Sequence, residues 1–271
     1  MNVFADTMVL TGRMMKHMTR SVDTIMTVVL MPIMLMLAFI YIFGGAMTIP
    51  QETYKGFIVP AILLFTVASG VGYTAFRLNT DVQNGIFERF HSMPIAKSAI
   101  LNSHVMTSVI FNFISALLVL ISSILIGFRP KADVFDWAVG LLLLLVATYA
   151  LSWIAVLFGL IARNNETAIA FSYLLIGLLF ISSGFVPTET LPKVLRGFAD
   201  YQPMTPIINS LRSILTDGKI PADIWGAFVW SIGAIVIFQV LSMSIGKNYV
   251  SAAAGKDGNS ERDYRDAKGR A

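Results

Sequence analysis

The amino-acid sequence predicts an all-α polytopic membrane protein with six transmembrane helices. Of its 271 residues, 56% are hydrophobic and only 13% are charged, whereas soluble domains carry about a quarter charged residues. The few charged residues also leave long stretches that contain no Asp, Glu, Lys or Arg. Six of these stretches hold 21 residues or more: 24–51, 56–76, 98–128, 137–162, 167–188 and 224–246.

The length and pattern of these stretches favour helices over barrel strands. A spanning helix needs about 20 apolar residues, and only helices and closed barrels satisfy their backbone hydrogen bonds inside a bilayer. Barrel strands alternate apolar and polar residues over about 9–11 positions, whereas residues 141–145 are five consecutive leucines. We therefore expect spans at approximately 24–46, 56–76, 103–127, 137–161, 167–186 and 224–246.

The placement of Lys and Arg predicts the orientation of the chain. An even number of spans puts both termini on one side, and that side would carry 13 of the 20 Lys and Arg residues. Because basic residues concentrate in cytoplasmic segments, we expect both termini in the cytoplasm of a multi-pass plasma-membrane protein. Residues 1–20 contain Asp6, Arg13, Lys16 and Arg20 and no apolar core, so we expect no signal peptide in this segment.

The segment before the first span has the pattern of an interfacial helix. Residues 3–22 place Phe4, Met8, Met15, Met18 and Val22 along one helical face. The other face carries most of the basic side chains of this segment, which favours a helix lying on the cytoplasmic leaflet. The alternative is a loosely helical, solvated start of the chain.

The connection over 77–97 predicts a short amphipathic helix on the cytoplasmic side. Apolar residues recur there at helical spacing, and Pro94 would end the helix. These apolar residues are Ile86, Phe87, Phe90 and Met93.

Two further segments lie outside the predicted spans. The external connection at about 187–222 contains five prolines separated by apolar pieces, and a free loop of that length is uncommon. We expect short helices on or in the outer leaflet there. Residues 251–271 are polar and of mixed charge, so we expect a disordered cytoplasmic tail beyond a transmembrane domain at 1–250.

Several kinds of chemistry have no sequence signal in this chain. The sequence contains no phosphate-binding Gly-x-x-x-x-Gly-Lys-[Ser/Thr] loop, no His-Glu-x-x-His motif and no cysteine. Its three histidines, His17, His91 and His104, lie far apart. The spans carry no Asp, Glu, Lys or Arg, which disfavours ion-gradient coupling and acid–base catalysis in the membrane. We therefore expect no catalytic, cofactor or metal site in this chain and no nucleic-acid partner.

Two stretches resemble the ABC-2 family of exporter permeases, in particular the daunorubicin-resistance-like transmembrane subunits. The stretch from Asp81 to Ile95 is similar to the family's acidic–Gly–x–x–Glu–Arg–x–x–x–x–Pro loop. The stretch from Phe180 to Leu211 is similar to its Ser-Gly-x-x-Pro … Leu-Pro … Asn-Pro-x-Thr signature, with Gln202 where Asn is usual.

The resemblance implies partners and a mechanical role for both stretches. It implies a second permease copy, identical or similar, and a separate ATPase subunit that binds ATP and Mg. The first stretch would be the coupling helix that contacts the ATPase, although a solvated, salt-bridged turn is the alternative. Its residues are Asp81, Gly85, Phe87, Glu88, Arg89, Phe90 and Pro94.

The second stretch would form a break in helix five near an outer gate. Close helix packing and simple termination by proline are both compatible with its composition. The residues concerned are Ser183, Gly184, Pro187, Pro192 and Pro203.

These observations favour the permease subunit of an ATP-driven ABC exporter, a transport protein and not an enzyme. Its cargo would be an amphipathic or hydrophobic compound such as a drug, an antibiotic or a lipid-like molecule, because the spans offer no fixed charge. The alternatives are a polysaccharide- or lipid-exporting ABC permease and a non-transport membrane sensor or scaffold that uses the 77–97 connection to bind a partner.

Overall fold

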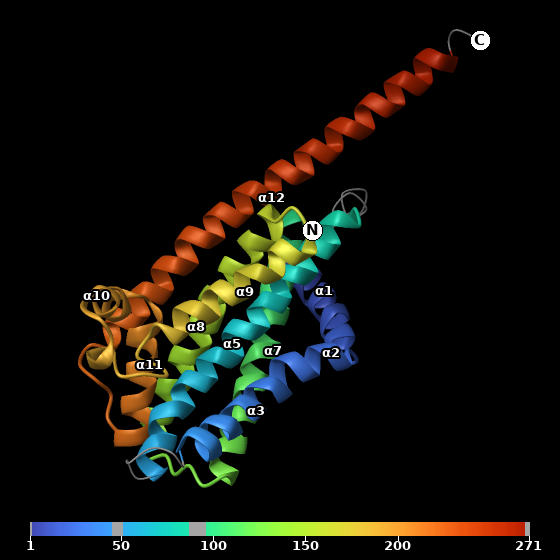
Figure 1. The fold of residues 1–271 in the computed structure, drawn as a ribbon. Helices are drawn as coiled ribbons and strands as arrows, with labels where there is room; N and C mark the ends of the chain where they lie inside the picture. The colour runs from blue at the N-terminus through green and yellow to red at the C-terminus, as the bar shows by residue number, and fades with distance from the viewer. Residues whose placement is uncertain (1, 45–50, 87–95, 269–271) are drawn as a thin grey trace.

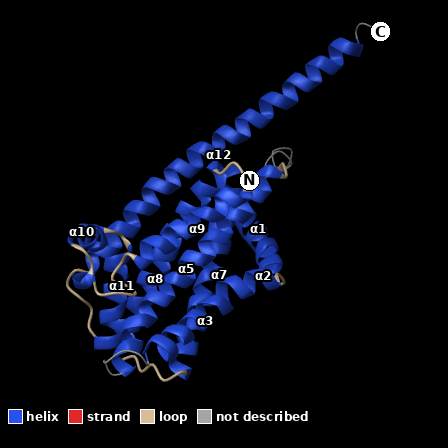
Figure 2. Ribbon diagram, viewed as in Figure 1, coloured by secondary structure: helices blue, strands red, loops and turns tan. Residues whose placement is uncertain are grey.

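The structure is a computed structural model that describes residues 2–44, 51–86 and 96–268 (Figure 1). The secondary structure of these residues consists of helices joined by turns, and they include no strand (Figure 2). The prediction of an all-α polytopic membrane protein is therefore confirmed.

The chain begins with a helix that packs against the bundle. Helix α1 (Val3–Met18) ends four residues before the predicted boundary, and it contacts α7. Met18 is buried, whereas Phe4 and Met8 are exposed. The predicted helix is therefore present, and the apolar face that we expected to lie on lipid is partly covered by protein.

The first span contains two π-helical segments, of which the first lies just before a proline. Pro32 has no N–H to donate to the carbonyl of Val28, and its ring crowds that carbonyl. The widened turn η1 lies just before the proline, where a π-helical insertion can absorb the misfit. The elements of this span are α2 (Val22–Ile25), η1 (Met26–Leu30), α3 (Met31–Leu37) and η2 (Ala38–Phe43).

Three long helices form the centre of the bundle. Helix α5 contacts α3, α7, α8, α9 and α11, so it is the central element. Helix α8 begins with a reciprocal capping box, in which the Asp133 carboxylate accepts from the Asp136 amide and the Asp136 carboxylate accepts from the Asp133 amide. The three helices are α5 (Gln51–Gln83), α7 (Lys97–Leu125) and α8 (Val134–Ile161).

Helix α9 (Asn165–Phe180) is shorter than the predicted span at 167–186. Its N-terminus is capped by Asn164, whose side chain accepts from the Thr167 amide at 2.8 Å. At its other end the chain leaves the helix at Ile181, well before Pro187. Sixteen residues span about 24 Å at 1.5 Å per residue, less than the roughly 30 Å of a hydrocarbon core.

The connection after α9 contains the short helices that the sequence predicted. They fold against the end of the bundle, where α11 contacts α5, α8, α9 and α12. These elements are η3 (Thr188–Thr190), α10 (Lys193–Tyr201), α11 (Met204–Arg212) and η4 (Ser213–Asp217).

The last helix differs from the prediction at its C-terminal end. Helix α12 (Ile224–Lys268) packs along α8 and then extends past the bundle (Figure 1). We expected disorder over 251–271, but the structure continues the helix to Lys268. No proline follows Pro221, and three alanines at 252–254 favour helix propagation.

Five described helices are long and apolar enough to cross a membrane. They correspond to five of the six predicted spans. The remaining prediction, the fifth span at 167–186, corresponds to α9, which is a shorter apolar helix. That α9 crosses the membrane, and with it the total of six crossings, therefore stays a prediction. The five segments are Val22–Phe43, Thr53–Gln83, Ser98–Leu125, Val134–Ile161 and Ile224–Gly246.

The connections gather at two ends of the bundle. At the amino-terminal end, the Asp6 carboxylate accepts from the Ala96 amide at 3.0 Å, which fixes α1 beside the start of α7. The end of α5 and the α8–α9 connection also meet, since the Gln83 side-chain amide donates to the Arg163 carbonyl at 3.2 Å. At the far end, the Lys131 amide donates to the Leu215 carbonyl at 2.9 Å, which joins the α7–α8 connection to η4.

Glycines let the central helices approach closely. A Cβ at Gly72 of α5 would lie 2.1 Å from Cβ of Ser172 on α9, and one at Gly159 of α8 would lie 2.8 Å from the Ala75 carbonyl. Without a hydrophobic driving force between helices in lipid, such small residues permit the van der Waals contact that holds membrane helices together.

Candidate functional site

The sequence-predicted site residues fall at opposite ends of the bundle. Asp81 and Gly85 lie at the amino-terminal end, whereas Ser183, Gly184 and the three signature prolines lie at the far end. These two groups therefore do not form one site.

At the amino-terminal end, Asp81 joins two helices. Helix α5 continues to Gln83, beyond the predicted boundary at 76, so Asp81 lies in its last turn and not in a separate helix. Its Oδ2 atom is 3.1 Å from Nε2 of His104 on α7, whose side chain is buried. Gly85 follows with φ 66°, a left-handed conformation that favours glycine where a helix ends.

Two residues earlier, Asn79 links α5 to the end of α8. Its Nδ2 atom donates to the Gly159 carbonyl at 3.0 Å and to the Ala162 carbonyl at 2.7 Å. The last carbonyls of a helix have no partner within the helix, so the buried Asn79 amide supplies one. The sequence analysis missed this residue, although an amide at the polar end of an apolar span was a usable signal.

The remainder of the predicted coupling helix lies outside the described residues. This applies to Phe87, Glu88, Arg89, Phe90 and Pro94, which fall within 87–95. Their contact with an ATPase stays a prediction. In the sequence this segment joins α5 to α7, two helices that are linked by the Asp81–His104 contact.

At the far end, the signature turn after α9 is held by side chains of α11. The Ser183 amide donates to Oγ1 of Thr205 at 3.3 Å, and the Ser183 hydroxyl donates to Oδ1 of Asn209 at 2.7 Å. A Cβ at Gly184 would lie 3.1 Å from Cβ of Ala61 on α5. The turn is therefore packed tightly between α5 and α11, in line with the close-packing interpretation.

Arg212 is the principal polar contact at this end, and the sequence analysis missed it. Its Nη2 atom donates to the Ser183 carbonyl at 2.7 Å and to the Phe57 carbonyl at 3.2 Å, and its Nε donates to the same Phe57 carbonyl at 3.3 Å. Its guanidinium carbon lies 4.0 Å from the centre of the Phe57 ring. Burial lowers the Arg212 pKa to about 10, so the side chain stays charged at neutral pH.

Pro60 supplies a further attachment point for this segment on α5. A proline cannot donate to the carbonyl four residues earlier, which leaves the Gly56 carbonyl without its helical donor. The Thr216 hydroxyl of η4 donates to that carbonyl at 3.2 Å. A proline inside an apolar span was the available sequence signal, because it frees one backbone acceptor.

The three signature prolines start the short helices of the connection. Pro187 precedes η3, Pro192 precedes α10 and Pro203 precedes α11. Proline suits these positions because the first helical N–H groups have no partner within the helix. Pro187 lies after the turn that ends α9, so it does not itself end that helix.

A polar cluster joins three helices inside the bundle. The hydroxyl oxygens of Thr74 on α5 and Ser152 on α8 lie within hydrogen-bond distance of Oγ of Ser108 on α7, at 2.8 and 2.9 Å. The Asn112 amide of α7 donates to the same oxygen at 3.1 Å. Hydrogen bonds between neutral side chains contribute to helix association in membranes, and the cluster places no charge in the bilayer.

These features define a multi-pass α-helical membrane protein in which the connection between α9 and α12 folds into short helices at one end of the bundle. No group of three His, Asp or Glu side chains that could hold a metal ion occurs in the described part of the chain. The chain belongs to the ABC-2 type transporter family, whose sequence profile matches residues 5–216.

Curated relatives agree with this family. The chain is 29% identical over 222 residues to the daunorubicin resistance ABC transporter permease protein DrrB1 of Streptomyces coeruleorubidus, covering 82% of this chain and 78% of the relative. It is 21% identical over 237 residues to the probable doxorubicin resistance ABC transporter permease protein DrrC of Mycobacterium tuberculosis, covering 87% and 86%. A third relative, the doxorubicin resistance permease protein DrrB of that species, is 32% identical over 124 residues, covering 45% and 43%.

Proposed function

We propose that the chain is the transmembrane permease subunit of an ATP-driven ABC exporter. The observation that carries this proposal is the family match over residues 5–216, which includes both the 81–95 stretch and the signature turn after α9. The helical bundle supplies the membrane body of such an exporter.

The energy source would be a separate ATPase subunit. The sequence contains no phosphate-binding loop, so ATP and Mg would bind to the partner chain. The coupling contact would be made by residues 87–95, between α5 and α7. Movement there could reach the bundle through the Asp81–His104 contact and through Asn79, which links α5 to the end of α8.

The cargo would be an amphipathic or hydrophobic compound. The names of the relatives refer to daunorubicin and doxorubicin, and the predicted spans contain no Asp, Glu, Lys or Arg that would pair with a charged cargo. These names favour drug or antibiotic efflux over polysaccharide export and over a sensor or scaffold role.

A second permease copy, identical or similar, would complete the pathway. Large apolar side chains such as Tyr173 and Leu174 on α9 and Val236 and Ile237 on α12 are exposed. The lipid bilayer and a second permease together would cover these surfaces.

Both termini would be cytoplasmic, and the connection at the far end would be external. In the structure α1 and the extension of α12 lie at the same end of the bundle (Figure 1), which supports this arrangement. Cysteines introduced at Thr188 and Ser260 would be probed with a membrane-impermeant thiol reagent in intact cells. We expect labelling at position 188 only, and labelling at 260 alone would reverse the orientation.

Export with and without an ATPase tests the function itself. Cells would express the chain alone, with a co-expressed ABC ATPase, or with that ATPase lacking its phosphate-binding lysine, and retained daunorubicin would be measured by fluorescence. We expect lower retention only with the chain and the intact ATPase together. Equal retention in all three strains would contradict daunorubicin export, and lower retention with the chain alone would contradict ATP coupling.

Variants in 87–95 test the coupling contact. Buried aromatic anchors carry most of the affinity of an interface, and rim charges carry less. Phe87→Ala and Phe90→Ala should therefore weaken co-purification of the ATPase by about tenfold or more, while Arg89→Ala should weaken it less. Replacing Glu88 should reduce export with less loss of assembly. Normal assembly and export in all four variants would indicate a solvated turn.

A further inference from the structure

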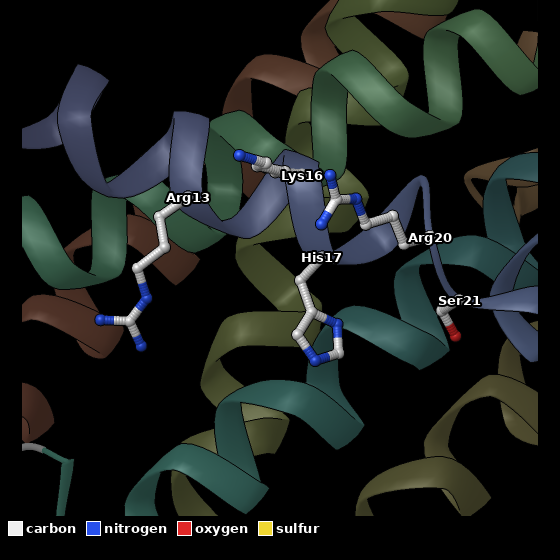
Figure 3. Close-up of a pocket in the computed structure, with 5 residues that line it drawn as sticks. All are labelled: Arg13, Lys16, His17, Arg20 and Ser21. Atoms are coloured by element: carbon white, nitrogen blue, oxygen red, sulfur yellow. The ribbon is translucent and has the colours of Figure 1, made fainter.

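A basic pocket lies on α1 and the turn that follows it. Its volume is about 500 Å³, and its lining residues are Arg13, Lys16, His17, Arg20 and Ser21. Figure 3 shows these side chains on α1 and the turn that follows it, with His17 directed toward the neighbouring helix α5. None of the described residues that line the pocket is acidic.

The spacing of these residues concentrates positive charge on one helical face. Lys16 and Arg20 are four residues apart, so their charged side chains are neighbours on the helix surface. Like charges at this spacing destabilise an isolated helix. The opposite face of α1 packs on the bundle through Met18, which is buried, so packing against the bundle does not require the basic face. A bound anion would relieve the repulsion.

Arg77 of α5 adds a fixed charge and sets the tautomer of His17. The Nη1 atom of Arg77 lies 3.1 Å from Nδ1 of His17. Arginine can only donate, so Nδ1 accepts and the ring proton lies on Nε2. That N–H is then available as a donor to an anion. The Arg77 guanidinium also lies 6.0 Å from the centre of the Tyr73 ring, which helps to fix its position.

An apolar surface begins directly beside the pocket. Ser21 is followed by Val22, and the candidate membrane span runs from Val22 to Phe43. Val22, Met26 and Leu30 are 68%, 51% and 43% exposed, and their spacing of four residues places them on one helical face. The pocket therefore lies at the depth where lipid phosphates meet the hydrocarbon of a bilayer.

We propose that this pocket binds the phosphate of an anionic phospholipid in the leaflet at the amino-terminal end. Lys16, Arg20 and the His17 ring contact the phosphate, and the acyl chains run along the Val22–Met26–Leu30 face. Clusters of basic residues next to a membrane span attract anionic headgroups in this way. The adjoining apolar face favours a lipid over free phosphate, because free phosphate gains nothing from that surface. The site is independent of the transported compound.

Lipid binding to the purified full-length chain tests the site. Native mass spectrometry would measure retention of dioleoyl phosphatidylglycerol and of dioleoyl phosphatidylcholine by the wild type and by Lys16→Gln/Arg20→Gln. Removing one cation near a membrane surface weakens binding about fivefold, so the double variant should bind phosphatidylglycerol about 25-fold less tightly. Its binding of phosphatidylcholine should not change.

Two matched variants separate the site from general charge effects. Lys193→Gln/Arg196→Gln removes the same charge from exposed positions on α10 at the far end and should retain wild-type affinity for phosphatidylglycerol. Lys16→Arg/Arg20→Lys keeps the charge and should also retain it. Elution of each variant as a single symmetric peak in size-exclusion chromatography would confirm folding.

Three results would overturn the proposal. Equal retention of the two lipids by the wild type would remove the headgroup preference. An equal loss of phosphatidylglycerol in the α10 variant would indicate a non-specific charge effect. Displacement of phosphatidylglycerol by inorganic phosphate at matched concentration would identify a soluble anion as the ligand instead of a lipid.

Discussion

Replacing Arg212 with glutamine removes the contacts that join three segments at the far end. The guanidinium donates to the Ser183 carbonyl of the signature turn and to the Phe57 carbonyl of α5, at 2.7 and 3.2 Å. It also lies over the Phe57 ring at 4.0 Å. Glutamine is shorter and cannot span both carbonyls, so at least one buried acceptor would lose its donor.

The size of the effect follows from these contacts. A hydrogen bond to a charged group contributes about 1.5–3 kcal/mol, and an exposed or partly exposed cation–π contact contributes about 1 kcal/mol. Because Arg212 is half-buried, we take the lower end, about 1.5 kcal/mol, for each of the two carbonyl acceptors and expect a loss of at least about 3 kcal/mol, before the ring contact is counted. At roughly 2–4 °C per kcal/mol for a chain of this size, the melting temperature should fall by about 6–12 °C.

Thermal unfolding in detergent, followed by fluorescence-detected size-exclusion chromatography, would measure this change. Arg212→Lys keeps the charge but not the planar set of guanidinium donors, so its melting temperature should lie between those of the wild type and Arg212→Gln. Lys219→Gln removes an exposed cation from the same connection and should change stability by less than about 0.5 kcal/mol.

The Arg212 pKa of about 10 lies far above neutrality. The difference between wild type and Arg212→Gln should therefore be the same at about pH 6 and pH 8. A wild-type melting temperature in Arg212→Gln would refute the reasoning.

Two other predictions concern contacts between helices, measured by the same thermal assay. Gly72→Ala would place a Cβ 2.1 Å from Cβ of Ser172, so we expect a loss of about 1–3 kcal/mol from overpacking. Gly177→Ala is the matched control, because nothing lies within 4 Å of its Cβ position, and it should be neutral or stabilising. Asn79→Ala removes the donor to two carbonyls at the end of α8 and should cost about 1–3 kcal/mol. An unchanged melting temperature in Gly72→Ala or Asn79→Ala would contradict the corresponding contact.

The membrane helices could be predicted because charge and hydropathy respond directly to the solvent. A residue such as Leu143 needs only an apolar surrounding, and a bilayer or a protein core provides one equally well. The five long spans follow from this rule, and so do the short helices started by Pro187, Pro192 and Pro203.

Features that depend on individual hydrogen bonds could not be predicted in the same way. Hydropathy continues through Ile181 and Phe185, yet the turn after Phe180 is fixed by Thr205 and Asn209 of α11, which are more than 20 residues away. The sequence places Arg212 in the external connection, but a charge alone does not reveal which carbonyls it will contact. The pairing of Asp81 with His104 likewise requires the packing of α5 on α7.

ATP-driven transport by a reconstituted complex tests the central claim most directly. The purified chain and its ATPase would be reconstituted in liposomes. Complexes inserted with the ATPase facing outward would move daunorubicin into the liposomes, and this accumulation would be followed by fluorescence quenching. We expect accumulation only with ATP, Mg and both subunits present, and no ATP hydrolysis by the chain alone. Accumulation by the chain without the ATPase, or ATP turnover by the chain alone, would contradict an ABC exporter permease.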